Sequence, residues 1–170
     1  SGTVMQGFFQ NPMADPYIIG ISSGAALGAT LAIATGLDFW FFGLSGVGLF
    51  AFAGALVVTL VVYAISLRGG RLPATVVLLS GIALGSLAAA LTSYMTISVN
   101  DGADVQRILF WLMGSLAARR WEHVHMVWPQ IVVGGLFLQF YARDLDLIVQ
   151  GEEQAQFLGV DVESVKRRLL

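Results

Sequence analysis

Long uncharged stretches alternate with short polar turns over most of the chain. Four such stretches cover residues 16–35, 46–67, 74–99 and 123–141. Each is long enough for one crossing of a hydrocarbon core about 30 Å thick, which takes about 20 apolar residues in a helix. A polar turn ends each of the first three stretches, at residues 36–38, 68–73 and 100–103. The pattern predicts four transmembrane helices.

Two shorter apolar segments do not reach that length. Residues 1–10 are predicted to be the end of a truncated transmembrane helix, the alternative being a loose terminus. Because a residue that precedes proline is pushed out of the helical region, we expect a break at Asn11–Pro12. Pro129 lies within the fourth predicted span, where a proline can kink a membrane helix without destroying it.

Residues 104–116 are predicted to form a short periplasmic or interfacial helix. Asp104 can cap it, since its side chain can accept hydrogen bonds from the free N–H groups of the first turn. Apolar residues then come at helical spacing, namely Val105, Ile108, Leu109, Leu112 and Met113. Gly114 is placed to end the helix. The alternative is that this segment is the start of the next span.

The segment Asn11–Ala29 is rich in small residues. Pro16 suits the first position of a helix, where its missing N–H group would be unpaired anyway. Small residues then recur every four positions, at Gly20, Gly24, Gly28, Ala32 and Gly36, and a second set lies at Gly81, Gly85 and Ala89. This spacing favours close packing of helices within a bilayer. The alternative is that glycine is simply commoner in membrane helices.

Residues 142–170 differ from the rest because they carry many charges. Glu152 and Glu153 are acids of the kind that favour a helix N-terminus, and Gly159 suits a helix end. Asp161 can cap a second short helix. We therefore expect a water-exposed segment made of a helix, a glycine stop and another helix.

The basic residues predict an orientation. With alternating spans, six fall on the side of residues 142–170, namely Arg68, Arg71, Arg143, Lys166, Arg167 and Arg168. Three fall on the opposite side, namely Arg107, Arg119 and Arg120. Because basic residues favour the cytoplasmic side, residues 142–170 are predicted to be cytoplasmic.

The composition supports a membrane protein. Hydrophobic residues make up 56% of the 170 residues and charged residues only 12%, whereas soluble domains hold about 25% charged residues. The fold class is therefore predicted to be all-α, as a polytopic membrane protein with a glycine-rich bundle of transmembrane helices. The net charge of −2 lacks the basic footprint of a nucleic-acid-binding protein. The abrupt ends of the sequence suggest a fragment.

Motifs for catalysis and metal binding are absent from the sequence. It has no Cys, no nucleotide-binding GxxxxGK[ST] loop, no HExxH and no GxSxG. His123 and His125 are two residues apart and so point to different sides of a helix, which is poor geometry for a shared metal. Span centres without ionisable residues argue against an ion-coupled transporter. We predict no catalytic residue, no metal site and no cofactor in this chain.

Four segments together resemble a known family. They are NPMADPYIIGISSGAALGA (11–29), LLSGIALGSLAAALTS (78–93), QRILFWLMGSL (106–116) and GEEQAQFLGV (151–160). Their order and spacing resemble the FecCD-type permease family, the membrane subunits of bacterial ATP-binding-cassette importers for ferric siderophores, haem or cobalamin. The resemblance implies a ten-helix permease of about twice this length, of which this chain covers the end of the second helix to the loop after the sixth.

The resemblance also implies roles for particular residues. The helix that couples the permease to the ATPase corresponds to Gly151, Glu152, Ala155, Leu158 and Gly159. The cytoplasmic gate corresponds to two loops that contain Asn11, Met13, Ala74 and Thr75. Arg119 and Arg120 are possible contacts for a periplasmic substrate-binding protein, or else interfacial anchors.

The hypothesis is therefore an importer permease in the bacterial inner membrane that works by alternating access. Its implied partners are a second permease copy or a paralogue, cytoplasmic ATPase subunits, a periplasmic binding protein and the lipid membrane. A non-transporting scaffold or receptor subunit with an adaptor-binding tail is the alternative. It accounts for residues 142–170 but not for the gate-like loops. An intramembrane enzyme is disfavoured, because the sequence holds no set of catalytic residues.

Overall fold

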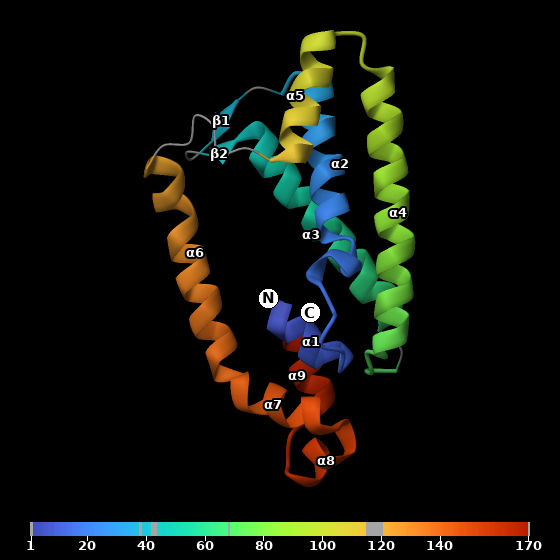
Figure 1. Ribbon diagram of the computed structural model, residues 1–170, viewed down its shortest axis with the longest axis vertical. Coiled ribbons are helices and arrows are strands. Elements are labelled where there is room, and N and C mark those ends of the chain that lie inside the picture. Colours follow the sequence, from blue (N-terminus) through green and yellow to red (C-terminus); the bar gives the residue numbers. More distant parts are fainter. Residues whose placement is uncertain (1, 38, 42–43, 68, 115–120, 170) are drawn as a thin grey trace. The chain divides into compact units, whose positions relative to one another are not determined.

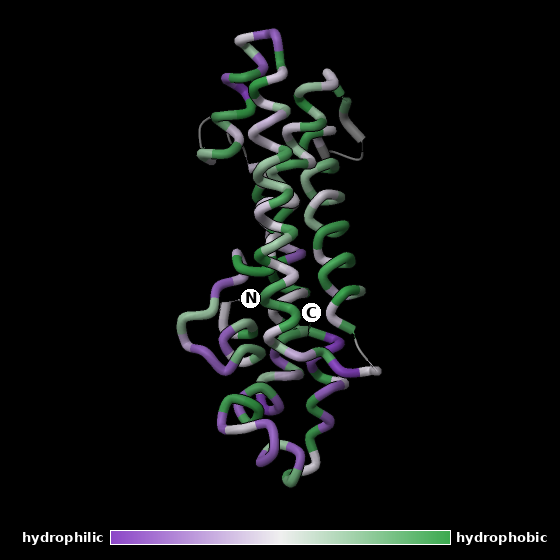
Figure 2. Tube along the Cα trace, turned by 90° about the vertical axis from the view of Figure 1, so that its right-hand side faces the viewer, coloured by the Kyte–Doolittle hydropathy of each residue, from purple (hydrophilic) through white to green (hydrophobic). Residues whose placement is uncertain are grey.

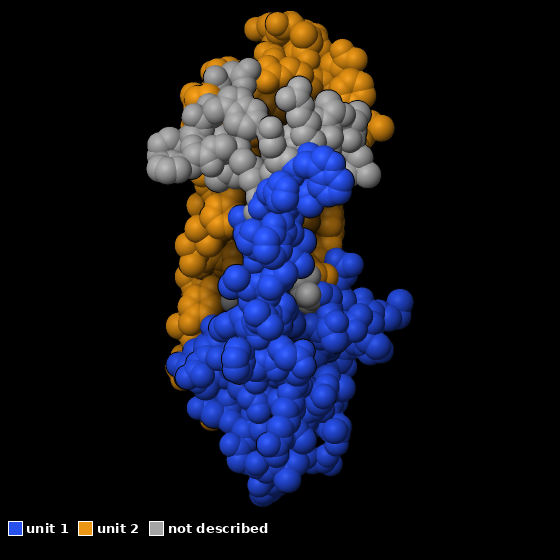
Figure 3. Space-filling view, turned by 90° about the vertical axis from the view of Figure 1, so that its left-hand side faces the viewer, with its two compact units in different colours: residues 1–15, 116–170 blue, residues 16–115 orange. Residues whose placement is uncertain are grey.

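The chain folds into two compact units (Figure 3). The computed structural model describes residues 2–37, 39–41, 44–67, 69–114 and 121–169. Unit 1 comprises Ser1–Asp15 and Leu116–Leu170, and unit 2 comprises Pro16–Ser115. Unit 1 therefore joins two segments that lie far apart in the sequence.

Unit 2 is a helical bundle. Its elements are the 3-10 helix η1 (Pro16–Ile19), α2 (Ile21–Ala34), β1 (Trp40–Phe41), β2 (Leu44–Ser45), α3 (Gly46–Ser66), α4 (Ala74–Ser98) and α5 (Gly102–Met113). Helix α2 lies against α3 and α4, and α5 folds back beside α2 (Figure 1). The two strands pair antiparallel, Trp40 with Ser45 and Phe41 with Leu44. The all-α prediction is confirmed, with this ribbon as a small addition.

The expectation of one continuous helix over residues 16–35 needs correction. Pro16 opens a 3-10 turn, and the α-helix begins only at Ile21. Gly20 separates the two with φ of +83°, a left-handed conformation that glycine adopts without the steric cost of a Cβ atom. Gly36 also has a positive φ and comes after the helix. The small-residue row inside α2 is therefore Gly24, Gly28 and Ala32.

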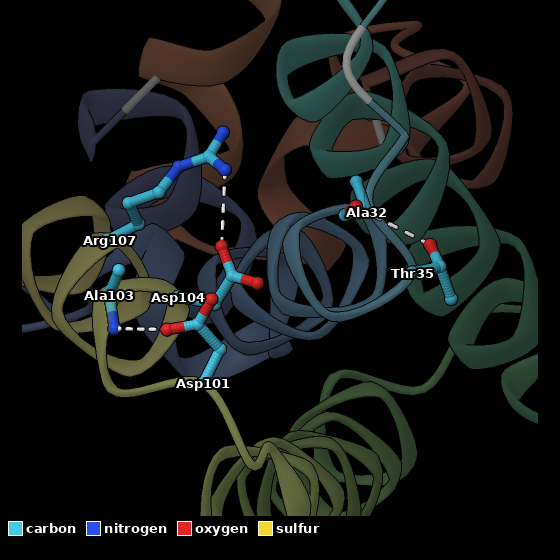
Figure 4. Close-up of polar contacts among 6 residues, drawn as sticks. All are labelled: Ala32, Thr35, Asp101, Ala103, Asp104 and Arg107. Atoms are coloured by element: carbon cyan, nitrogen blue, oxygen red, sulfur yellow. Dashed lines mark hydrogen bonds and ion pairs between the residues drawn. The ribbon is translucent and has the colours of Figure 1, made fainter.

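The start of α5 also differs from the prediction. The capping residue is Asp101 rather than Asp104, because its carboxylate accepts a 2.8 Å bond from the Ala103 N–H group (Figure 4). Asp104 lies in the first turn and forms a 3.2 Å ion pair with Arg107. Gly114 ends the helix with φ of +72°, as predicted. Whether this segment is interfacial or belongs to the next predicted span stays a prediction.

Unit 1 consists of α1 (Gly2–Phe9), α6 (Trp121–Phe140), α7 (Ala142–Gln150), α8 (Glu152–Phe157) and α9 (Val162–Leu169). Helix α1 ends just before Asn11–Pro12, where the break is predicted. Pro129 lies inside α6. The tail holds one helix more than expected, because α7 precedes the predicted pair. Hydrophilic residues recur through α7–α9, whereas α3 and α4 are hydrophobic along most of their lengths (Figure 2).

Two of the described helices, α3 and α4, are long and apolar enough to cross a membrane. Helix α2 and the segment Val127–Phe140 are apolar but shorter. The predicted division into membrane spans stays a prediction, since length and composition are its only support.

Candidate functional site

Helices α7, α8 and α9 form a small folded body around a common apolar core. Buried side chains from all three meet there, namely Ile148, Ala155, Val162 and Val165. Two glycines with positive φ make the reversals between these helices: Gly151 at +143° before α8 and Gly159 at +87° after it. The Asp161 carboxylate accepts a 3.1 Å bond from the Ser164 N–H group, which confirms the predicted cap.

Helix α8 has a buried face and an exposed apolar edge. Ala155 is fully buried in the core, so it can shape a partner contact but not face a partner. Leu158 is 67% exposed and Phe157 is 90% exposed. Phe157 was not among the predicted contact residues. Its position beside Leu158 and just before the predicted helix end at Gly159 could have indicated it. We call Phe157 and Leu158 the apolar edge of α8.

An ion pair between a buried Lys166 and a partly exposed Glu152 ties α8 to α9. The Lys166 ammonium lies 2.7 Å from Oε1 of Glu152, and the Lys166 side chain is only 4% exposed. The same ammonium lies 5.6 Å from the ring centre of Phe8 in α1, within cation–π range. Sequence analysis treated Lys166 only as one of the cytoplasmic basic residues. Its burial depends on partners remote in sequence, for which no local signal exists.

An open hollow of about 450 Å³ lies beside the apolar edge. Its lining includes Tyr141, Arg143, Asp144, Leu158, Gly159 and Arg168. Arg168 donates a 3.4 Å hydrogen bond to the Tyr141 hydroxyl, and this bond raises the pKa of the guanidinium. The hollow therefore has both charges and an apolar wall, as suits a protein contact.

The first predicted gate loop is a tight turn. The Asn11 side chain accepts a 2.9 Å bond from the Met13 N–H group, and the Asn11 carbonyl accepts a 3.0 Å bond from the Ala14 N–H group. These bonds leave the Met13 side chain exposed. The turn thus presents a flexible apolar side chain on a short, rigid support.

The second predicted gate loop is the start of α4. Ala74 is the first residue of the helix, and Thr75 is exposed. Pro73 occupies the cap position, and its carbonyl accepts a 3.1 Å bond from the Val77 N–H group. The two loops belong to different units, Asn11–Met13 to unit 1 and Ala74–Thr75 to unit 2.

The packing glycines of α2 make backbone contacts with α3. A Cβ atom added at Gly24 would lie 2.6 Å from the Gly54 carbonyl oxygen, and one at Gly28 would overlap the Phe50 carbonyl. Neither position has room for a side chain. Gly54 belongs to the same contact, since a Cβ there would overlap the Gly24 carbonyl. Sequence analysis missed Gly54, because it belongs to no four-residue series.

The remaining packing glycines join η1 and α2 to α4. A Cβ atom at Gly81 would lie 2.8 Å from the Ile18 carbonyl oxygen, and one at Gly85 would lie 3.2 Å from the Gly20 Cα atom. Gly20 therefore serves both the turn and the contact. Ser80 in α4 bonds back to the Val76 carbonyl at 2.7 Å and also contacts the Ser66 hydroxyl of α3 at 3.1 Å.

Two other predictions concern the binding-protein contact and metal binding. Arg119 and Arg120 lie outside the described residues, so their role as binding-protein contacts stays a prediction. Among the residues that are described, no group of three or more His, Asp or Glu side chains could hold a metal ion.

Comparison with known proteins agrees over the whole chain. The model of the FecCD transport family matches residues 1–170. The cobalamin import system permease protein BtuC of Halobacterium salinarum is 46% identical over 170 residues, covering 100% of this chain and 44% of that protein. The hemin transport system permease protein HmuU of Yersinia pestis is 36% identical over 175 residues, covering 100% of this chain and 51% of that protein.

A solved structure is similar as well. It is described as an inward-facing conformation of a metal-chelate type ABC transporter, and it matches with a TM-score of 0.85 and 28% identity. The match covers 99% of this chain and 52% of that one. The chain thus spans about half the length of the relatives it matches. With a family match from the first residue to the last, the chain belongs to the FecCD transport family.

Proposed function

We propose that this chain is part of a permease subunit that imports a metal chelate of the siderophore, haem or cobalamin class across a cytoplasmic membrane. The observation that carries the proposal is the whole-chain similarity to two importer permeases, at 46% and 36% identity. The uncharged helices α3 and α4 support it, since a large chelate can pass between helices by alternating access without ion coupling.

The energy for transport comes from a separate subunit in this proposal. The 170 residues hold no nucleotide-binding loop, so ATP would be hydrolysed by cytoplasmic ATPase partners. The apolar edge of α8 is the surface best suited to dock on such a partner, since an exposed Phe–Leu pair stands on a rigid body. Gly151 and Gly159 would set its orientation.

The same proposal implies the remaining parts of the importer. Two permease copies, or one copy and a paralogue, would enclose the path. A binding protein on the opposite side would deliver the chelate, with Arg119 and Arg120 as its contacts. A ligand or partner shifts an equilibrium only by its differential affinity for the two states. The ATPase must therefore contact α8 differently in its two nucleotide states for the gate loops to move.

The substrate is the finer part of the proposal. Cobalamin is the first chelate to test, because the relative at 46% identity is a cobalamin import permease. Haem is the second, because the relative at 36% identity transports hemin. Ferric siderophores complete the test set.

The experiment is to tag the full-length gene product and identify by mass the proteins that co-purify from gently solubilised membranes. We expect an ATPase with a P-loop in about equal amount. Vesicles with the purified complex should then take up one of the three chelates only when ATP is present. If no nucleotide-binding protein is recovered and no uptake is measured, the importer proposal is wrong and the scaffold alternative takes its place.

A further inference from the structure

Helix α1 packs directly on α7 within unit 1. A Cβ atom built at Gly7 would lie 3.2 Å from Cδ2 of Leu145, so this glycine lets the two helices approach closely. Phe8, the next residue, is buried. The contact matters because α1 leads directly into the loop Asn11–Met13.

One side chain connects α1 to the two helices beyond α7. Lys166 extends from α9, pairs with Glu152 of α8 at 2.7 Å and places its ammonium 5.6 Å from the Phe8 ring centre. A buried ammonium is costly unless it is paired, so the three helices are most stable when they stay together around this charge. We call Lys166, Glu152 and Phe8 the lysine junction.

A second connection lies at the end of α1. Gln10 has φ of +49°, in the left-handed region where a helix end more often has glycine. The local bond from the Asn11 N–H group to the Gln6 carbonyl, at 3.0 Å, accounts for that backbone conformation. It does not account for the side chain, whose Nε2 donates a 2.9 Å bond to the Ile148 carbonyl of α7. This bond holds Gln10, the residue next to Asn11, against α7.

We infer that Lys166 and Gln10 are positioning residues that make α1 and α7–α9 one moving body, so that displacement of α8 is delivered to the loop Asn11–Met13. The inference rests on the proposed importer function. It adds a physical route, since the apolar edge of α8 and the predicted gate loop are then joined through side-chain contacts instead of through the chain alone.

The first test is Lys166→Met in the full-length importer complex, because Met keeps the aliphatic stem and removes the charge. We expect ATP hydrolysis to persist while the amount of chelate transported per ATP falls. The fall should be at least about fivefold, which is the smallest effect that typical coupling free energies produce. Arg167→Met is the matched control, since Arg167 is exposed and should leave that ratio unchanged. A folded Lys166→Met complex with an unchanged ratio would overturn the inference.

The second test locks the body covalently. The Cβ atom built at Gly7 lies 3.9 Å from the Leu145 Cβ atom, which suits a disulfide, whose Cβ atoms are about 3.8 Å apart. These 170 residues contain no other Cys. The oxidised pair Gly7→Cys with Leu145→Cys should keep full uptake. When it is combined with Lys166→Met, it should restore the amount of chelate transported per ATP. Uptake blocked by oxidation and recovered on reduction would show that α1 must leave α7, which overturns the inference.

Two readouts separate this inference from the proposed function. Unmodified complex without ATP-dependent uptake refutes the proposed function before any variant is compared. Hydrogen exchange of the α1 amides needs no transport, and Lys166→Met should speed it whereas Arg167→Met should not. If Lys166→Met does not assemble, the disulfide pair decides alone, because it keeps the lysine junction.

Discussion

The helices inside unit 1 and the helices inside unit 2 pack by different means. In unit 2, α2 meets α3 and the turn Ile18–Gly20 meets α4 backbone to backbone at glycines, and serine and threonine hydroxyls mostly bond back to their own helices. In unit 1, the helices α7–α9 meet through larger side chains around Ile148 and through the pair of the buried Lys166 with Glu152. The contrast is the one expected if the predicted spans of unit 2 lie in lipid and α7–α9 lie in water: lipid gives no hydrophobic drive between helices, so close packing decides, whereas water favours a core.

The largest effect should come from filling the glycine contact of unit 2. Gly28→Val places a Cβ atom on the Phe50 carbonyl, a backbone group that cannot rotate away. We expect a loss of about 3 kcal/mol or more, the upper range for overpacking, seen as failed assembly or a much lower Tm in detergent.

The control for this variant is Gly102→Ala, where an added Cβ meets nothing within 4 Å. Equal stability of Gly28→Val and the unmodified protein would show that α2 and α3 can part without cost. The comparison between the units would then fail for unit 2.

The second effect concerns the core of the tail. Ile148→Ala leaves a cavity among Ala155, Val162 and Val165, and we expect a loss of about 2–5 kcal/mol of stability in unit 1. Limited proteolysis should then cut within residues 142–170 while α3 and α4 stay intact. Val149→Ala, at an exposed neighbour, should have little effect. Identical proteolysis of Ile148→Ala and the unmodified protein would mean that this core contributes little.

The third effect lies at the turn after α8. Gly159→Val forces a β-branched residue into φ of +87°, which costs about 1–2 kcal/mol or more. Because the turn sets the apolar edge of α8, we expect ATP hydrolysis to continue with reduced uptake. Gly159→Asn is the control, since Asn tolerates this conformation. Normal uptake by Gly159→Val would count strongly against the assignment of α8 as the coupling helix.

Sequence reasoning succeeded where the signal is local. The helix ends at Gly114 and Gly159, the break before Pro12 and the cap by Asp161 depend on neighbouring residues alone. It was wrong where two local solutions compete. Asp101 and Asp104 can both cap a helix, and the structure uses the earlier one, whose carboxylate accepts the Ala103 N–H bond.

It also missed features that only long-range contacts create. Gly20 is indistinguishable by sequence from the other small residues of its series, yet it alone of the first three has a positive φ. Lys166 is one of three consecutive basic residues, and its burial depends on Glu152 and Phe8, which lie far away along the chain. The apolar edge of α8 can be recognised only from the structure, in which Ala155 is buried while Phe157 and Leu158 are exposed.

The smallest effect concerns the buried hydroxyl of Thr30 in α2 of unit 2. The Thr30 hydroxyl is buried without a hydrogen-bond partner among the described residues, whereas Ser80 and Thr92 each bond to a carbonyl one turn earlier. An unsatisfied buried polar group is destabilising, so Thr30→Val, which keeps the shape, should raise stability by about 1 kcal/mol. Thr92→Val loses the hydrogen bond to the Ala88 carbonyl and should lower the stability. Detergent Tm values for the two variants test this, and a lower Tm for Thr30→Val would mean that the hydroxyl has a hydrogen-bond partner outside the described residues.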